Sequence, residues 1–423
     1  MKSLKHKDNI FSIESILAIY AVFCAGGGSD VQNMLYGINN ASIIGTMIII
    51  LFCLFIIVKH LKEINLKDIV LLVGFLLIWG WVGTIMTRGN NHYFYIIYNI
   101  FTSYAIFLGY KKRIFLKFEN VVTFFAALSL VLFFACWFIP PAYNMLHSFS
   151  WGRHGDVDLS FFRIFLMSNS SIYLFPFRNA GFAWEPGRYS VILVVALFFN
   201  MCRYHFNNLR NPNFYILTLA LITTQSTTGY VCYAVLIIYF FLKSRKKVIA
   251  LTLISVLGAA FITYGFLSEK MITLFNWQDD QASNFTEYVY WRAEKNEAYV
   301  PQRFEGLTYD FLNVVHSPIF GYGPEVSNSY MNTEVFPGAR VAPSNGIIQI
   351  LASAGLLVGL FFYLLLFRAS RSFSYIFKIN EPWWFFILFL LINVSYNFWF
   401  ITIFLVFVMY NFYEKTLRNY SHI

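Results

Sequence analysis

The sequence predicts an all-α polytopic membrane protein with about twelve transmembrane helices. Of its 423 residues, 58% are hydrophobic and only 12% are charged, a balance that does not suit a soluble domain of this size. The apolar runs are long and continuous and do not alternate with polar residues, which argues against a transmembrane β-barrel. Seven clusters of lysine and arginine separate these runs and predict how the chain crosses the bilayer.

The basic clusters determine the expected number of crossings. They lie at residues 2–7, 59–67, 111–117, 203–210, 243–247, 368–378 and 415–418. Because positive residues collect on the cytoplasmic side of short loops, an even number of crossings separates each neighbouring pair of clusters. Each of the six intervals between clusters then holds one crossing outward and one crossing back, an excursion, which gives twelve helices with both termini in the cytoplasm. The helices are expected at residues 10–27, 41–58, 68–87, 92–110, 119–139, 189–206, 213–226, 228–242, 248–267, 345–367, 383–396 and 398–413.

Two of these excursions require a helix break inside an apolar stretch. Residues 213–242 are too many for one straight span and few for two, so we expect a break at Gln225–Gly229. The stretch 383–412 repeats this pattern, with a break expected at Asn393–Asn397. Polar residues at such breaks are tolerated where they face protein or a water-filled cavity.

Two excursions carry large outer loops, where any chemistry is expected. The first, residues 140–188, contains the apolar pieces 161–167 and 173–177 and is expected to lie partly in the membrane interface. The second, residues 268–342, is polar and mixed in charge, and we expect it to form a helical cap. No repeat or low-complexity linker divides the chain, so residues 1–423 are predicted to form a single membrane domain.

Charge, cysteines and acidic residues exclude several kinds of function. The net charge of +10 follows from topology and contact with anionic membrane lipids, not from nucleic-acid binding. The five cysteines all lie in apolar runs, which excludes an outer domain held by disulfides. The expected outer face has no Asp-x-Asp pair and no cluster of histidine and cysteine, and the adjacent Asp279 and Asp280 diverge in most backbone geometries. We therefore predict no metal and no cofactor.

The first motif of interest runs from Arg178 to Arg188, at the entry of the sixth helix. Pro186 suits the first turn of a helix, where its missing N–H group is harmless. This places Glu185 near the N-cap, between the two arginines. Glu185 is therefore either a capping residue beside interfacial arginines or a carboxylate placed for chemistry.

The second motif comprises Arg303 and the stretch from His316 to Gly323. Gly321 and Gly323 flank Tyr322 in a tight turn that lets backbone approach a ligand closely. His316 is more often structural than catalytic in such a setting.

The third motif, Ser344-Asn345-Gly346, opens the tenth helix. Ser344 or Asn345 can cap that helix, and Gly355 and Gly359 further along allow close helix packing. If the start of the helix faces a substrate cavity, its free N–H groups attract an anionic phosphate.

In their order and setting these stretches resemble the O-antigen ligase/polymerase superfamily. The residues from Arg178 to Pro186 look like its first outer-loop signature, and Gln225–Gly229 looks like its short broken hairpin. Arg303, residues 318–323 and residues 344–346 look like its second outer-loop pattern. The resemblance covers about residues 120 to 410 and implies a GT-C-like glycosyltransferase architecture in the bacterial cytoplasmic (inner) membrane.

The resemblance also bears on which member of the superfamily this is. O-antigen ligases typically carry a histidine followed by Asn, Ser or Gln at the start of the helix after the large loop. Here that position reads Ser344-Asn345, which favours a Wzy-type polymerase of O-antigen, capsule or a similar polysaccharide. A ligase is the alternative.

A donor glycan on a polyprenyl diphosphate is implied, transferred on the outer face to a hydroxyl of a second lipid-linked unit. Arginine grips phosphate oxygens bidentately and keeps its charge, so we expect Arg178 and Arg303 to hold the diphosphate without a metal. Arg188 and Arg340 are second choices, and Tyr322, Ser344 and Asn345 are further substrate-binding candidates.

Glu185 is the first candidate for the base that takes the acceptor proton, and His316 is the second. A protein that regulates chain length is left open as a further partner.

Two rival functions belong to other classes. A flippase or transporter for lipid-linked sugars usually needs charges within the bilayer or an internal repeat, and the expected helices show almost no charge and no repeat. Other polytopic glycosyltransferases that use polyprenyl sugars, including peptidoglycan polymerases, would rely on an essential acidic residue in their large loop.

Overall fold

The computed structural model describes residues 12–25, 39–64, 91–149, 157–161, 164–169, 177–208, 211–243, 285–295, 298–299, 301, 303–323, 326–343, 345–395 and 401–413. Helices account for 78% of these residues. The chain divides into two compact units, which are described separately. The first unit comprises residues 1–64, 98–233 and 401–410, and the second comprises residues 65–97, 234–400 and 411–423.

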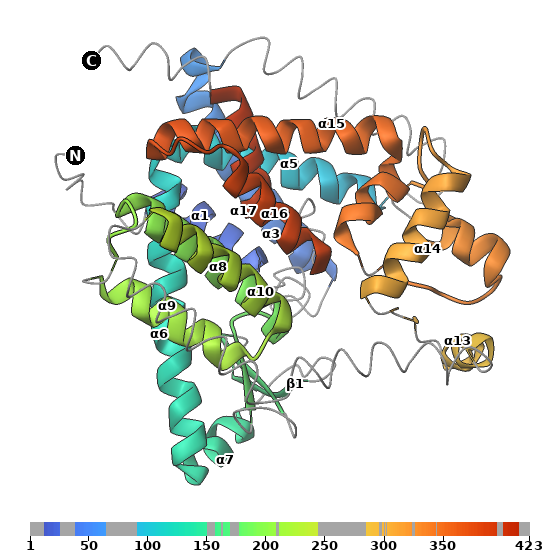
Figure 1. The fold of residues 1–423 in the computed structure, drawn as a ribbon, viewed down its shortest axis with the longest axis horizontal. Coiled ribbons are helices and arrows are strands. Elements are labelled where there is room, and N and C mark those ends of the chain that lie inside the picture. Colours follow the sequence, from blue (N-terminus) through green and yellow to red (C-terminus); the bar gives the residue numbers. More distant parts are fainter. Residues whose placement is uncertain are drawn as a thin grey trace. The chain divides into compact units, whose positions relative to one another are not determined.

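The first unit is built around the long helix α6, Arg113–Phe138. Helices α8 (Pro186–Arg203) and α9 (Pro212–Thr224) lie side by side and both pack against α6 (Figure 1). The other elements that lie wholly or partly in this unit are α1 (Ile13–Ala25), α3 (Asn39–Lys59), η1 (Leu61–Glu63), α5 (Asn91–Tyr110), α7 (Pro140–Ser148), α10 (Thr227–Lys243), α17 (Thr402–Val408) and η5 (Met409–Tyr413).

A three-stranded antiparallel sheet interrupts the helices of the first unit. Its strands follow one another in the order β1 (Val157–Phe161), β2 (Phe165–Asn169) and β3 (Phe177–Gly181). Leu159, Phe165 and Met167 alternate along β1 and β2 and are buried together with Phe133 and Leu146 of α6 and α7. The all-α prediction did not include this sheet. Its period-two alternation is too short to stand out in so apolar a chain.

The second unit contains the helices of the second outer segment and the long helix α15, Gly346–Phe377. Helix α16 (Trp383–Ser395) lies along α15, where Asn393 Nδ2 donates to the carbonyl of Gly346 at 3.2 Å and to the Tyr363 hydroxyl at 3.2 Å. The remaining described elements are α13 (Phe285–Glu294), α14 (Arg303–His316), η2 (Val326–Asn328) and η3 (Met331–Val335).

The first predicted helix break is confirmed. Helix α9 ends at Thr224, Gln225 adopts a left-handed conformation with φ 50° and ψ 40°, and α10 begins at Thr227. At the second predicted break α16 ends at Ser395, inside the expected stretch, and residues 396–400 lie outside the described part of the chain.

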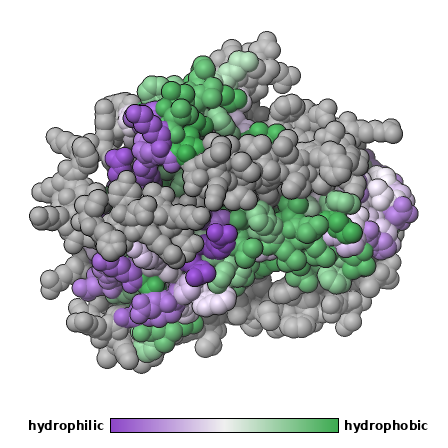
Figure 2. All heavy atoms as spheres, turned by 90° about the horizontal axis from the view of Figure 1, so that it is seen from above, coloured by the Kyte–Doolittle hydropathy of each residue, from purple (hydrophilic) through white to green (hydrophobic). Residues whose placement is uncertain are grey.

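The described helices carry the features of a membrane protein. By length and composition, α6 and α15 can each cross a bilayer. Helix α3 exposes a stripe of large apolar side chains at helical spacing, which suits contact with lipid and not with water. Figure 2 shows broad apolar areas on one face of the described residues. The helices expected at 68–87 and 248–267 and both chain termini lie outside the described residues, so the number of twelve and the orientation stay predictions.

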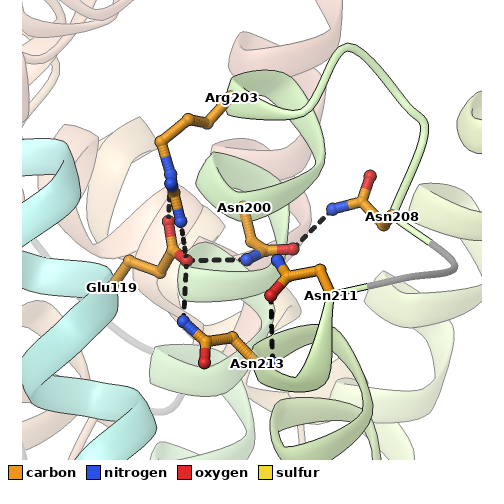
Figure 3. A network of polar contacts seen from close by, with 6 residues as sticks. All are labelled: Glu119, Asn200, Arg203, Asn208, Asn211 and Asn213. Atoms are coloured by element: carbon orange, nitrogen blue, oxygen red, sulfur yellow. Dashed lines mark hydrogen bonds and ion pairs between the residues drawn. The ribbon is translucent and has the colours of Figure 1, made fainter. Parts of the chain in front are cut away.

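A buried polar network fastens α6, α8 and α9 together (Figure 3). The fully buried carboxylate of Glu119 accepts hydrogen bonds from Asn200 Nδ2 at 2.6 Å and from Arg203 Nε at 2.9 Å and Nη2 at 2.5 Å. Asn213 Nδ2 approaches the same carboxylate at 3.4 Å, and Asn208 donates to Asn200. Glu119 of α6 lies at the edge of an expected span, and both helices that pack against it there, α8 and α9, contribute donors.

Candidate functional site

Strand β3 closes the helix break between α9 and α10. Arg178 Nε donates to the carbonyl of Thr224, the last residue of α9, at 3.3 Å, and Gln225 Nε2 donates to the carbonyl of Phe177 at 2.7 Å. A helix end leaves its last carbonyls without partners, and a cation there complements the helix dipole. Arg178 therefore lies half-buried at the break, bound to a backbone oxygen.

The neighbouring residue, Asn179, anchors the strand from its other face. Its side chain is fully buried and donates to Ser129 Oγ at 3.2 Å and Thr223 Oγ1 at 3.0 Å, while its Oδ1 accepts from the N–H of Gly181. Gly181 has φ +53°, and a Cβ atom there would lie 2.3 Å from the Tyr189 ring of α8. The first outer-loop motif and the broken-hairpin motif thus form one closely packed structure.

Glu185 occupies the N-cap position of α8, with Pro186 in the first turn, as predicted. Its side chain makes no capping hydrogen bond. Within the described residues it also forms no ion pair with Arg178 or Arg188. The Arg188 guanidinium instead lies over the Trp184 ring, 5.0 Å from its centroid. The carboxylate is left at the positive end of the α8 dipole, available to a ligand.

In the second unit, the Gly-Tyr-Gly turn binds a break in α15. Gly355 has φ 78° and ψ 166°, which interrupts the helix. The N–H groups of Tyr322 and Gly323 donate to the carbonyls of Ala352 and Ser353, each at 2.9 Å, and the N–H of Leu356 donates to the carbonyl of Pro318 at 2.7 Å. The turn therefore replaces the hydrogen bonds that the broken helix loses.

Glycine is required on both sides of this contact. A Cβ atom at Gly355 would lie 2.0 Å from the carbonyl oxygen of Ile319, and one at Gly321 would lie 2.4 Å from the carbonyl of Ser353. The sequence predicted that Gly355 allows two helices to pack closely. The close approach is instead between the turn and the helix break, because only glycine fits a positive φ with backbone at that distance.

Asp310 of α14 lies at the start of α15. Asn345 caps that helix, as the sequence predicted for Ser344 or Asn345, by accepting from the N–H of Ile347 at 3.1 Å. The Asp310 carboxyl group accepts hydrogen bonds from the backbone N–H of Asn345 and from the Asn313 side chain. Its side chain is 2% exposed, and among the described residues its Oδ2 atom has no hydrogen-bond partner.

Burial raises the pKa of Asp310 to about 7, although the two hydrogen bonds lower it in part. The carboxyl group lines a cavity of about 10 Å³ together with Tyr309, Tyr322 and Ser329. Burial, and to a smaller extent the charge of Asp310, raise the pKa of Tyr322. A buried carboxyl group with a perturbed pKa at a cavity is a typical sign of a functional site.

The structure brings some predicted site residues together and leaves others apart. Tyr322 and Asn345 both lie beside Asp310. His316 is exposed and stacks on Tyr330 with ring centroids 3.5 Å apart, and Arg340 is exposed. Arg303 begins α14, but its side chain lies outside the described residues, as does Ser344. Arg178 and Arg303 belong to different units, so their meeting at one diphosphate stays a prediction.

Sequence reasoning missed Asp310, and the structure reveals it through the burial pattern of α14. Helix α14 is inverted, in the sense that apolar side chains are exposed and polar ones are buried. Its exposed face carries Leu307, Phe311 and Val315, four residues apart, while Asp310 and Asn313 are buried. An amphipathic helix with its polar residues inside indicates a polar interior, which is typical of a binding site.

Among the described residues, no group of three or more His, Cys, Asp and Glu side chains could hold a metal ion.

These features define a helical membrane protein whose sequence motifs meet at two helix breaks. A family model described as O-antigen ligase matches residues 212–364, from the start of α9 into α15. The matched residues make up about a third of the chain, and this similarity agrees with the resemblance to the O-antigen ligase/polymerase superfamily that its motifs predicted. Members of this superfamily are integral inner-membrane, glycosyltransferase-like ligases and polymerases that act on lipid-linked sugars. No curated protein matches the sequence.

Proposed function

We propose that the protein polymerises polyprenyl-diphosphate-linked oligosaccharide repeat units on the outer face of the cytoplasmic membrane. The product is an O-antigen, a capsule or an exopolysaccharide. The observation that carries polymerase over ligase is the start of α15, where Ser344 and the N-cap Asn345 stand in place of the histidine pattern of ligases. The side chain of Asn345 caps the helix, and its backbone N–H group donates a hydrogen bond to Asp310.

The reaction is a metal-independent glycosyl transfer. The acceptor hydroxyl oxygen attacks the anomeric carbon of the donor, and the bond from that carbon to the diphosphate oxygen breaks. The diphosphate leaves with the electron pair, so negative charge grows on it in the transition state. Arg178 and Arg303, with Arg188 and Arg340 as second choices, stabilise that charge through charge-assisted hydrogen bonds. The hydroxyl proton passes to a base, for which the sequence proposes Glu185 and then His316.

The position of Arg178 supports this assignment. Its Nε donates to the end of α9, which orients the planar guanidinium at the helix break. The helix end holds the side chain in place, so little side-chain entropy is lost when it binds an anion. A lysine there keeps the positive charge but not the planar fork.

Arg178→Lys is expected to lower the rate of polymer formation by about 10²-fold or more, because a bidentate contact to the leaving group is lost. The measurement uses purified protein in detergent with a synthetic polyprenyl-diphosphate repeat unit, and gel separation of the products. Arg292→Lys, in helix α13 of the second outer segment, is the matched control and should leave the rate unchanged. Wild-type rate in Arg178→Lys, with an unchanged melting temperature, would remove Arg178 from the mechanism.

The same assay separates the alternative functions. A polymerase yields a ladder of lengthened lipid-linked products, and the ladder persists in EDTA because no metal takes part. A ligase transfers one glycan to a lipopolysaccharide-core acceptor and gives no ladder. A flippase moves the repeat unit across the bilayer of a vesicle and forms no new glycosidic bond. Loss of the ladder in EDTA would contradict the metal-independent mechanism.

A further inference from the structure

We propose that Asp310 accepts the proton of the acceptor hydroxyl, and that this hydroxyl binds in the cavity in front of its Oδ2 atom. This inference rests on the proposed function and revises one assignment within it. Proton transfer moves from Glu185 to Asp310, and Glu185 becomes a residue at the start of α8 without a part in proton transfer.

The carboxyl group of Asp310 is held by hydrogen bonds on one side and, within the described part of the chain, has an unpaired oxygen atom on the other. The backbone N–H of Asn345 and the amide of Asn313 fix the orientation of the carboxyl group. Its Oδ2 atom is buried and has no hydrogen-bond partner among the described residues. Buried polar atoms in folded proteins are nearly always paired, so an unpaired carboxylate oxygen beside a cavity indicates a missing donor, which a water molecule or the hydroxyl group of a ligand can supply.

The cavity limits what that donor can be. At about 10 Å³, it has room for one hydroxyl group or one water molecule and not for a sugar ring. Its lining includes Gly306, Tyr309, Tyr322 and Pro343. Two aromatic side chains beside one carboxyl group are a typical setting for a sugar, whose ring lies against an aromatic face while a single hydroxyl reaches inward.

Charge supports the same assignment. The titratable side chains that line the cavity with Asp310 are Tyr309 and Tyr322, and the described lining contains no lysine, arginine or histidine. Among the described lining residues no cation faces the carboxyl group, and burial raises the pKa of Asp310 to about 7. A general base works best when its pKa is near the operating pH. By contrast, His316 is exposed, and Glu185 lies half-buried at a helix end.

The step balances without a further reactant. The acceptor O–H bond breaks as its oxygen bonds to the anomeric carbon, and the proton passes to Asp310 Oδ2. The diphosphate carries away the electron pair of the broken glycosyl bond. Asp310 then returns its proton to water before the next cycle.

Asp310→Asn is the decisive variant, because asparagine has the same shape and can still accept the Asn345 N–H. We expect the rate of ladder formation to fall by about 10²- to 10⁴-fold. Binding of the radiolabelled repeat unit as the donor, through its diphosphate, should not change, since the arginines are intact. Glu334→Gln, an exposed carboxylate in η3 of the same outer segment, is the matched control and should keep the wild-type rate.

The pH profile distinguishes a base from a merely structural carboxyl group. The wild-type rate should fall roughly tenfold per pH unit below about 7, as Asp310 takes up a proton. Asp310→Asn should lack this acidic limb. Asp310→Glu should restore part of the rate with a shifted limb.

The melting temperature gives a second readout that does not depend on activity. The pKa of Asp310 is raised in the folded protein above its ordinary value of 3.8, so stability is greatest at low pH and is lost as pH rises towards about 7. The wild-type melting temperature should therefore fall over this interval relative to that of Asp310→Asn. At about pH 8 the variant should melt at the higher temperature.

Three results would overturn the inference. One is a wild-type rate in Asp310→Asn, and another is an acidic limb that disappears in Glu185→Gln and persists in Asp310→Asn. A melting difference between wild type and Asp310→Asn that does not change with pH is the third. A wild-type protein that forms no ladder at all would contradict the proposed function itself, and this inference with it.

Discussion

Gly355→Ala is expected to prevent the second unit from folding normally, with a loss of stability of about 4 kcal/mol or more. Two effects add. The backbone at Gly355 has φ +78°, which side-chain-bearing residues rarely adopt, and a Cβ atom there would lie 2.0 Å from the carbonyl oxygen of Ile319. The backbone of the Gly-Tyr-Gly turn cannot move away, because its N–H groups are bonded to Ala352 and Ser353.

Gly338→Ala provides the matched control for this effect. Its φ is +85°, so alanine meets nearly the same backbone strain, but no atom lies within 4 Å of the added Cβ. We expect it to cost only about 1 kcal/mol. The yield of monodisperse protein in detergent and its melting temperature measure both variants. Equal behaviour of the two would mean that strain, and not the contact with Ile319, accounts for the loss.

Glu119→Ala is expected to destabilise the first unit by about 3–5 kcal/mol. The carboxylate is fully buried and receives hydrogen bonds from Asn200, Arg203 and Asn213. Its removal leaves a partly buried guanidinium and two amides without their acceptor, and a buried donor without a partner is costly. Because α9 ends at the α9–α10 break, we expect polymer formation to fall along with the melting temperature.

A double variant separates the loss of the ion pair from the loss of packing. Glu119→Leu combined with Arg203→Met replaces the pair with apolar groups of similar size, so it should be more stable than Glu119→Leu alone. Glu63→Ala, which removes an exposed ion pair with Lys111, should change stability by less than about 1 kcal/mol. A double variant less stable than Glu119→Leu would show that Arg203 stabilises the fold without Glu119.

The break between α9 and α10, which depends on the length of an apolar stretch, was predictable from the sequence. The break at Gln225 followed from a stretch too long for one span and too short for two, and the structure confirms it. The sheet at residues 157–181 was not predicted, because five-residue strands leave little periodicity in a chain so rich in apolar residues. Its inward side chains, Leu159 and Met167, look like membrane-interface residues in sequence and are core residues in the structure.

Candidate-site residues were predictable where their role follows from the residues next to them in the sequence. Asn345 caps α15 because a polar residue precedes a long apolar helix, and this pattern is local. Asp310 could not be identified in that way, because its burial and its missing partner arise from contacts with η3 and α15, which are distant in the sequence. The pairing of Arg178 with the end of α9 is likewise a contact over 46 residues that local pattern does not encode.

The inverted character of α14 has a practical consequence for anyone who studies the second outer segment as a separate fragment. Leu307, Phe311 and Val315 cover its outside, and Asp310 and Asn313 lie inside. If such a fragment is expressed alone, it should associate through this exposed apolar surface and precipitate from aqueous buffer. Antibody selection and ligand screening against this region are therefore best carried out on the intact protein in nanodiscs.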